Sequence, residues 1–151
     1  MTVPPTPQSS DTESHPPQAM MEALKGMART LGLRFVHAEP GRVEVEIPVS
    51  EAFSFRPGQL QATAVFAVAA AGSVLPPGWT NATVDTTLKI VAPAQGECLR
   101  ARGRVVDAGR LLTVCAADVW AVDAAGQERL CATLLATARN IDTGAPRPPR
   151  G

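Results

Sequence analysis

The residues best suited to chemistry in this chain are arginines that alternate along one predicted strand. Arg100, Arg102 and Arg104 take every second position, so their side chains share one face of that strand. Guanidinium forks match phosphate oxygens, and the row could therefore bind a phosphorylated ligand. The alternative is a solvated outer sheet face, where charges discourage aggregation. Arg110 follows Gly109 in the next turn, where a turn role and a ligand contact both remain open.

A second group of polar residues stands where a long apolar segment begins. Residues 59–75 are small and apolar on nearly every side, which predicts a helix buried all round. Gln61 and Thr63 lie in its first turns, and buried polar groups need partners, so they either cap backbone groups or line a ligand pocket. Arg56, at the mouth of this helix, is either a solvated loop charge or a cation beside the ligand.

The cysteines and histidines do not form a reactive pair or a metal site. Cys98, Cys115 and Cys131 are far apart and lack metal-ligand spacing. Their apolar surroundings predict buried free thiols in a reducing cytoplasm. A nucleophilic cysteine needs a nearby base, and the two histidines are His15 near the chain start and His37 at a strand end. We therefore expect no metal and no bound cofactor.

The elements that must position these residues predict an α+β domain. In chain order they are a helix over 19–31, strands over 33–37 and 42–48, a loop over 50–58, the buried helix over 59–75, and long strands over 81–91, 97–106, 110–122 and 127–141. Short glycine-containing turns link the last three strands, which is typical of an antiparallel meander. A long antiparallel sheet of about six strands wrapped around one helix accommodates every element.

Composition limits the partners and the extent of the domain. The 151 residues carry 14 basic and 14 acidic side chains, so the surplus of positive charge that nucleic-acid binding requires is absent. No apolar run reaches the roughly 18 residues of a membrane span, which predicts no membrane partner. The ends, 1–18 and 143–151, are rich in proline and predicted to be disordered around a single domain over 19–142. Residues 1–18 also lack the basic start and apolar stretch of a secretory signal.

Three motifs make residues 84–141 closely similar to one protein family. They are Ala-Pro-Ala-x-Gly at 92–96, Arg-x-Arg-Val-Val-x-x-Gly-Arg at 102–110, and Cys-Ala-Thr-x-x-Ala-Thr at 131–137. The segment resembles the second half of bacterial acyl-coenzyme A (CoA) thioesterases of the phenylacetic-acid-degradation type. This resemblance implies the hot-dog fold, a sheet wrapped around a helix, and acyl-CoA as substrate. It also implies a homodimer or homotetramer with an active site shared between subunits.

The first half of the chain departs from that family. The family's helix begins with His-Gly-Gly or His-Ala-Gly and has Asp or Glu nine residues after the His. One register places Gln61 and Ala70 at these positions, and the other places Arg56 and Val65 there. No Asp, Glu or His occurs anywhere over 52–84. A helix N-terminus can still polarise a thioester carbonyl, but the usual general base is missing.

Three hypotheses follow from this departure: hydrolysis with another acid, binding of an acyl-CoA or other apolar ligand without turnover, or a structural hot-dog subunit. Asp85 or Glu51 could supply the acid, and Gln59 or Gln61 could orient water. The resemblance matches Thr83 to a Ser or Thr that helps place that water. The predicted site comprises catalytic candidates Gln61, Thr63, Thr83 and Asp85, and substrate-binding candidates Arg56, Gly58, Gln59, Arg100, Arg102, Arg104 and Arg110.

Overall fold

The computed structural model describes residues 26–39, 41–62 and 79–142. The ends that were predicted to be disordered lie outside the described residues, and so does most of each predicted helix. The first helix is described only as α2 (Met27–Thr30), which ends before Gly32 as predicted. The prediction of a continuous helix was wrong at Gly26, which lies in a turn with φ +70°. The buried helix predicted over 59–75 is described only as far as residue 62.

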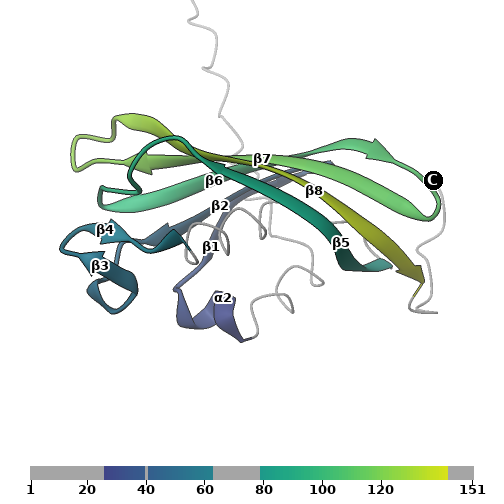
Figure 1. Cartoon of the computed structure of the whole chain (residues 1–151), viewed down its shortest axis with the longest axis horizontal. Helices are drawn as coiled ribbons and strands as arrows, with labels where there is room; N and C mark the ends of the chain where they lie inside the picture. Colours follow the sequence, from purple (N-terminus) through teal and green to yellow (C-terminus); the bar gives the residue numbers. More distant parts are fainter. Residues whose placement is uncertain (1–25, 40, 63–78, 143–151) are drawn as a thin grey trace, which may run out of the picture.

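A six-stranded antiparallel sheet dominates the described structure, as predicted. Its strands are β1 (Arg34–Glu39), β2 (Arg42–Pro48), β5 (Trp79–Ile90), β6 (Cys98–Ala108), β7 (Leu112–Val122) and β8 (Glu128–Asp142), in the spatial order β1-β2-β6-β7-β8-β5. The sheet is curved, and α2 and the small hairpin of β3 (Ser54–Arg56) and β4 (Gln59–Leu60) lie on its concave side (Figure 1).

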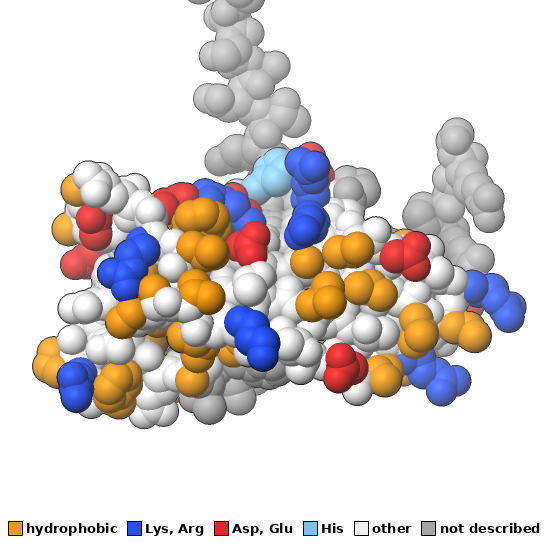
Figure 2. Space-filling view, turned by 45° about the horizontal axis from the view of Figure 1, so that its top comes forward, with side chains coloured by type: hydrophobic (Ala, Val, Ile, Leu, Met, Phe, Trp, Pro, Cys, Tyr) orange, Lys and Arg blue, Asp and Glu red, His pale blue; other side chains and the backbone are white. Residues whose placement is uncertain are grey.

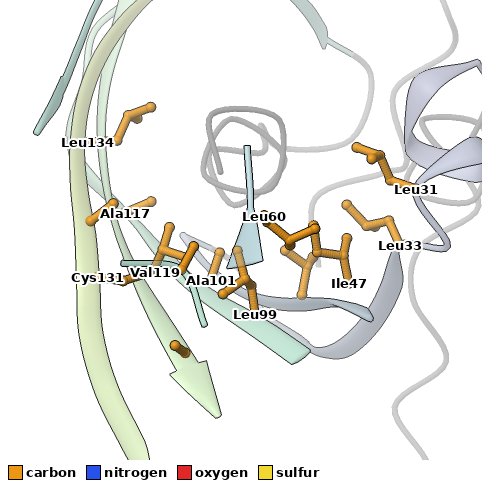
Figure 3. Close-up of a cluster of buried hydrophobic side chains, with 14 of the residues drawn as sticks. Leu31, Leu33, Ile47, Leu60, Leu99, Ala101, Ala117, Val119, Cys131 and Leu134 are labelled. Carbon is orange, nitrogen blue, oxygen red and sulfur yellow. The ribbon is translucent and has the colours of Figure 1, made fainter. Parts of the chain in front are cut away.

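The core forms on the concave face because apolar residues alternate with polar ones along the strands. In β2, the alternate residues Val43, Val45 and Ile47 are buried. Leu99 and Ala101 of β6 lie opposite Ile47 and Val45 and are fully buried. Figure 3 shows Ile47, Leu99 and Ala101 on this face, which we call the inner face, and they belong to one buried cluster with Leu60, Leu31 and Leu33. The opposite, convex face is the outer face.

The position predicted for the start of the buried helix was wrong. Residues 59 and 60 form strand β4, which pairs with β3 across the Pro57-Gly58 turn, and helical structure is first assigned at Ala62. Leu60 is 3% exposed, and its backbone N–H donates to the Ala94 carbonyl at 3.1 Å. A short apolar run is compatible with a buried strand or a buried helix, and here contacts with a distant segment decide.

The predicted turn over 107–109 was also displaced. A β-bulge between Val105 and Asp107 leaves Val106 without an opposite residue, and β6 continues to Ala108. The chain then reverses over 109–111, where the Gly109 N–H donates to the Leu112 carbonyl at 2.9 Å. The bulge therefore moves Arg110 to the middle of the turn.

Candidate functional site

A compact loop attaches the turn that carries Glu51 to the segment where the buried helix was predicted to begin. Residues Glu51–Phe53 form a 3₁₀ turn, and the Ser50 hydroxyl accepts a hydrogen bond from the Ala52 N–H at 3.3 Å. The Gln61 N–H donates to the Phe53 carbonyl at 2.9 Å, so the turn that carries Glu51 is attached directly to Gln61. The Gln61 and Glu51 residues are both exposed. The loop thus offers an amide and a carboxylate to a ligand at this end of the sheet.

The β3–β4 hairpin joins this loop to the Ala-Pro-Ala-x-Gly motif. Gln59 forms a β-bridge with Gln95, and the Gly96 N–H donates to the Gly58 carbonyl at 3.4 Å. The predicted residues Gly58, Gln59 and Gln61 therefore come together beside that motif. Arg56 is exposed on the same hairpin, with its guanidinium carbon 5.6 Å from the centroid of the Phe55 ring.

The structure places Thr83 and Asp85 on opposite faces of β5. Thr83 lies opposite Ala138, a buried inner-face residue, whereas Asp85 lies opposite Thr137 on the outer face. The bulge between them, at Val84, causes this change of face. Both candidates are exposed, and among the described residues no hydrogen bond or ion pair joins either of them to Gln61. Thr63 lies outside the described residues.

Arg100 and Arg102 share the outer face, as predicted, but the structure surrounds them with carboxylates. The Arg100 Nε donates to Glu46 at 2.7 Å and its Nη1 to Glu128 at 2.6 Å. The Arg102 Nε donates to Glu44 at 3.0 Å, and its Nη1 and Nη2 each donate to Glu128 at 2.7 Å. We call these five residues the outer-face ion cluster. Their pairing favours the structural alternative, because a phosphate would have to displace carboxylates already in place.

Hydrogen bonding within the ion cluster shifts the pKa of Glu128 and of its two arginine partners. The hydrogen bonds from Arg102 are the main cause of a lowered pKa at Glu128, and the same interaction raises the pKa of Arg102. A carboxyl whose pKa is lower in the folded than in the unfolded state stabilises the fold above its ordinary pKa of 4.5. That contribution is lost as the pH falls through the lower, folded value.

Replacing Glu128 with Gln is expected to lower the free energy of unfolding at pH 7 by about 1 kcal/mol, because the side chain of Glu128 is partly exposed. The difference from the wild type should shrink as the pH falls below 4.5. Urea unfolding of both proteins at several pH values measures it. The control is Asp123→Asn, since Asp123 accepts only backbone hydrogen bonds, from Ala125 and Gln127. A Glu128→Gln difference that grows on acidification would contradict the prediction.

Two other predicted arginines have no carboxylate partner among the described residues. Arg104 is exposed and lies opposite Arg42, and Arg110 is exposed in the turn after β6. Asp118 lies opposite Arg102, but the ion pairs of Arg102 run to the carboxylates of the ion cluster. Arg104 and Arg110 are therefore better placed than Arg100 and Arg102 to bind an anion.

The sequence did not lead us to predict the structural roles of two polar residues, Glu46 and Asn140. Glu46 is only 7% exposed and forms ion pairs with Arg34 and Arg100, although it was expected on the polar side of β2. Asn140 bonds to the turn that carries Arg110. Apart from the alternation of residues in β2, nothing in the sequence indicated that Glu46 would be buried in ion pairs. An asparagine near the end of a long strand was a weak signal for a turn contact.

Two of the three thiols are buried as predicted, whereas the prediction of a buried thiol was wrong for Cys98, which lies at the start of β6. All three cysteines are free; Cys115 and Cys131 are buried, and Cys98 is partly exposed. Burial raises the pKa of the Cys131 thiol to about 11, which keeps it protonated and unreactive at neutral pH. His37 is an exposed residue 3.6 Å from Glu39. In the described part of the chain, no group of three or more His, Cys, Asp or Glu side chains could hold a metal ion. None of the helices described there is long and apolar enough to cross a membrane.

Comparison with known proteins supports the fold. No protein-family model and no curated protein matches the chain. Among solved structures, it is similar to a phenylacetic acid degradation-related protein from Ralstonia eutropha JMP134, with 25% identity, 80% of this chain and 98% of that chain covered, and a TM-score of 0.66. It also shares its fold with thioesterase superfamily member 2 of zebra fish, with 24% identity, 80% and 90% coverage, and a TM-score of 0.66.

A stronger match decides the family. A thioesterase family protein from Silicibacter pomeroyi is 30% identical to the chain, with 83% of this chain and 97% of that chain covered and a TM-score of 0.77. The predicted hot-dog fold agrees with this match. The chain therefore belongs to the thioesterase family of hot-dog proteins.

Proposed function

We propose that this protein binds an acyl-CoA thioester at a subunit interface and hydrolyses it, with CoA as part of the substrate rather than a cofactor. The observation that carries the proposal is the hydrogen bond from the Gln61 N–H to the Phe53 carbonyl, which attaches the turn bearing Glu51 to one of the two residues that the resemblance places at the family's His position. Glu51 lies one residue before the stretch that contains no Asp, Glu or His. It is thus available to replace the family's carboxylate.

Glu51 is a better candidate for the general base than Asp85. Asp85 lies on the outer face of the sheet, whereas Glu51 lies in the loop that contacts Gln61. In the proposed reaction, the Glu51 carboxylate takes a proton from a water molecule as the water oxygen attacks the thioester carbonyl. The C–S bond then breaks, and the departing thiolate of CoA takes up the proton. Gln61 orients the water, and the backbone N–H of Ala62, where helical structure begins, stabilises the oxyanion.

The long edge strand β5 supports a site shared between subunits. β5 spans 12 residues and pairs with β8 on one side, and no described strand pairs with its other side. Only Asp85 and Lys89 on this strand are charged. A long strand with few charges at a sheet edge is a template for pairing with another chain. We therefore propose a homodimer in which two β5 strands pair antiparallel about a two-fold axis.

An apolar area on the outer face supports further association into a homotetramer. Leu112, Val114 and Ala116 occupy alternate positions of β7, and Leu135 of β8 lies opposite Ala116. Leu112 and Leu135 are 45% and 52% exposed. We call these four residues the outer apolar patch, and Figure 2 shows hydrophobic side chains gathered on the outer face. Because an outward sheet face is normally polar, the patch is suited to stacking of two dimers.

Substitution of Leu135 by Glu is expected to convert a tetramer into a dimer, because the charge would be buried unpaired between stacked sheets. Sedimentation equilibrium at micromolar concentration measures the mass. Val36→Glu is the matched control, since Val36 is 49% exposed but lies on β1, at the opposite edge of the sheet from β5. A monomeric wild-type protein would contradict the proposed assembly, and a wild-type dimer would contradict its second step.

A panel of short, long and aromatic acyl-CoA substrates tests the proposed activity, with release of the free CoA thiol as the readout. We expect turnover of at least one substrate well above the rate without protein. The absence of any Asp, Glu or His over 52–84 favours a second candidate function, binding without turnover. Tight acyl-CoA binding without hydrolysis would support this second function, and neither binding nor hydrolysis would leave a structural role. The three free thiols support a cytoplasmic location.

A further inference from the structure

One side chain, Asn140 of β8, holds the turn between β6 and β7. Its Nδ2 donates to the Gly109 carbonyl at 2.8 Å, and its Oδ1 accepts from the Thr113 hydroxyl at 2.9 Å. The Asn140 backbone N–H also donates to the Leu111 carbonyl at 2.8 Å. Thr113 is 2% exposed, so the hydroxyl that orients the amide is itself buried. Two hydrogen bonds from a neighbouring strand thus fix residues 109–111, and the third orients the amide that makes one of them.

The turn that Asn140 fixes presents a charged and an apolar side chain to solvent. Arg110 and Leu111 are exposed, and Arg110 has no carboxylate partner among the described residues. An antiparallel turn needs no such support, since the Gly109 N–H already bonds to the Leu112 carbonyl. A long side chain on a fixed backbone loses less entropy when it binds, which raises its affinity for an anion. The arrangement is therefore suited to presenting Arg110 to a ligand.

Within one chain, this turn is far from the candidate site. Ile90, at the end of β5 that leads to the 92–96 motif, lies opposite Ala132, whereas Leu112 beside the turn lies opposite Arg139. Seven residues of β8 separate these positions, or about 23 Å at 3.3 Å per residue. Antiparallel pairing of two β5 strands changes this relation. It brings the Trp79 end of one copy, and with it the 109–111 turn two strands away, toward the Ile90 end of the other.

We propose that Asn140 is a positioning residue: it fixes the 109–111 turn so that Arg110 of one subunit binds a phosphate group of the CoA whose thioester lies at the site of the other. This inference rests on the proposed function, because it requires a CoA-bearing substrate and pairing through β5. It assigns the phosphate contact to Arg110 rather than to Arg100 and Arg102, which the ion cluster already engages.

Calorimetric titration of the wild-type protein and its variants with CoA and with pantetheine, which lacks phosphate groups, tests the proposal. Asn140→Ala is expected to weaken CoA binding about tenfold and to leave pantetheine binding within about twofold. Arg110→Ala should do the same. The double variant should bind CoA no more weakly than Arg110→Ala alone, because Asn140 acts only through Arg110.

Two further variants separate positioning from a general effect on the fold. Thr113→Ser keeps the hydroxyl that orients the amide, so CoA binding should be retained, whereas Thr113→Val should weaken it. Asp123→Ala is the matched control, because Asp123 holds the 124–126 turn through two hydrogen bonds and that turn carries no charged side chain. It should lower the unfolding midpoint without changing CoA affinity.

The outcomes distinguish this inference from the function on which it rests. If the wild-type protein does not bind CoA, the proposed function fails and the inference fails with it. If Arg110→Ala weakens CoA binding but Asn140→Ala does not, the inference is overturned and the proposed function stands. Equal loss of CoA and pantetheine binding in Asn140→Ala, shared by Asp123→Ala, would show a general structural effect and would also overturn the inference.

Discussion

Replacing Glu51 with Gln is expected to lower kcat for acyl-CoA hydrolysis by about 100-fold or more while KM changes by no more than about twofold. The amide keeps the size and hydrogen-bonding capacity of the side chain but cannot take a proton from water. Glu51 is also the carboxylate whose backbone turn bonds to Gln61, so no other described acid is attached to the site in this way. Steady-state rates with the best acyl-CoA of the panel measure the effect.

Asp85→Asn is the control for this substitution, since Asp85 is exposed but lies on the outer face of the sheet, opposite Thr137. Its rate should match that of the wild type. The pH profile adds a second readout, because loss of the general base should remove the acidic limb of kcat. An unchanged rate in Glu51→Gln, or a loss in Asp85→Asn of similar size, would show that Glu51 is not the base.

The strands could be predicted from the sequence wherever one face is buried and the other is not. In the segment 42–48, the alternation of apolar and charged residues gave the bounds of β2 as the structure has them. The short turns correctly predicted the meander of β6, β7 and β8, because the sequence of a short turn decides its structure locally. The β3–β4 hairpin was missed, since what makes Leu60 a strand residue is its hydrogen bond to Ala94, 34 residues later.

The candidate site was less predictable, because its contacts depend on strand order. Alternation placed Arg100 and Arg102 correctly on one face, but their partners Glu44, Glu46 and Glu128 come from strands on either side. Only the order β2-β6-β7-β8 brings these residues together. The same holds for Asn140, whose bond to Gly109 joins positions 31 residues apart. A pattern along one strand shows which face a residue occupies but does not identify its neighbours across the sheet.

The Ala-Pro-Ala-x-Gly motif has a physical explanation in the close approach of two backbone segments. A Cβ atom at Gly96 would lie 2.5 Å from the Val122 carbonyl oxygen and 3.0 Å from its carbon. The same carbonyl accepts a hydrogen bond from the Glu97 N–H at 2.8 Å, and the Gly96 N–H bonds to Gly58. Because backbone atoms held on both sides cannot move aside as a flexible side chain would, position 96 has no room for any side chain.

Gly96→Ala is therefore expected to lower the free energy of unfolding by about 3 kcal/mol, the upper end of the usual cost of overpacking. For a domain of this size that loss corresponds to roughly 10 °C in Tm. It should also reduce thioester turnover, since displacing the 94–96 segment moves the β-bridge between Gln59 and Gln95. Circular dichroism during heating and urea unfolding measure the stability.

Gly126→Ala tests whether the loss of stability in Gly96→Ala comes from the close approach of backbone atoms or from the loss of a glycine's backbone freedom. Gly126 has φ +79°, so alanine there is strained, but a Cβ atom would meet nothing within 4 Å. It should cost about 1 kcal/mol, the usual penalty for the left-handed conformation. Gly96→Ala should exceed this cost by at least twofold. It alone should lower turnover, because among the described residues no hydrogen bond joins the 124–126 turn to the β3–β4 hairpin. Equal losses from the two substitutions would mean that the Val122 backbone yields to the added methyl group, and the motif would then need a different explanation.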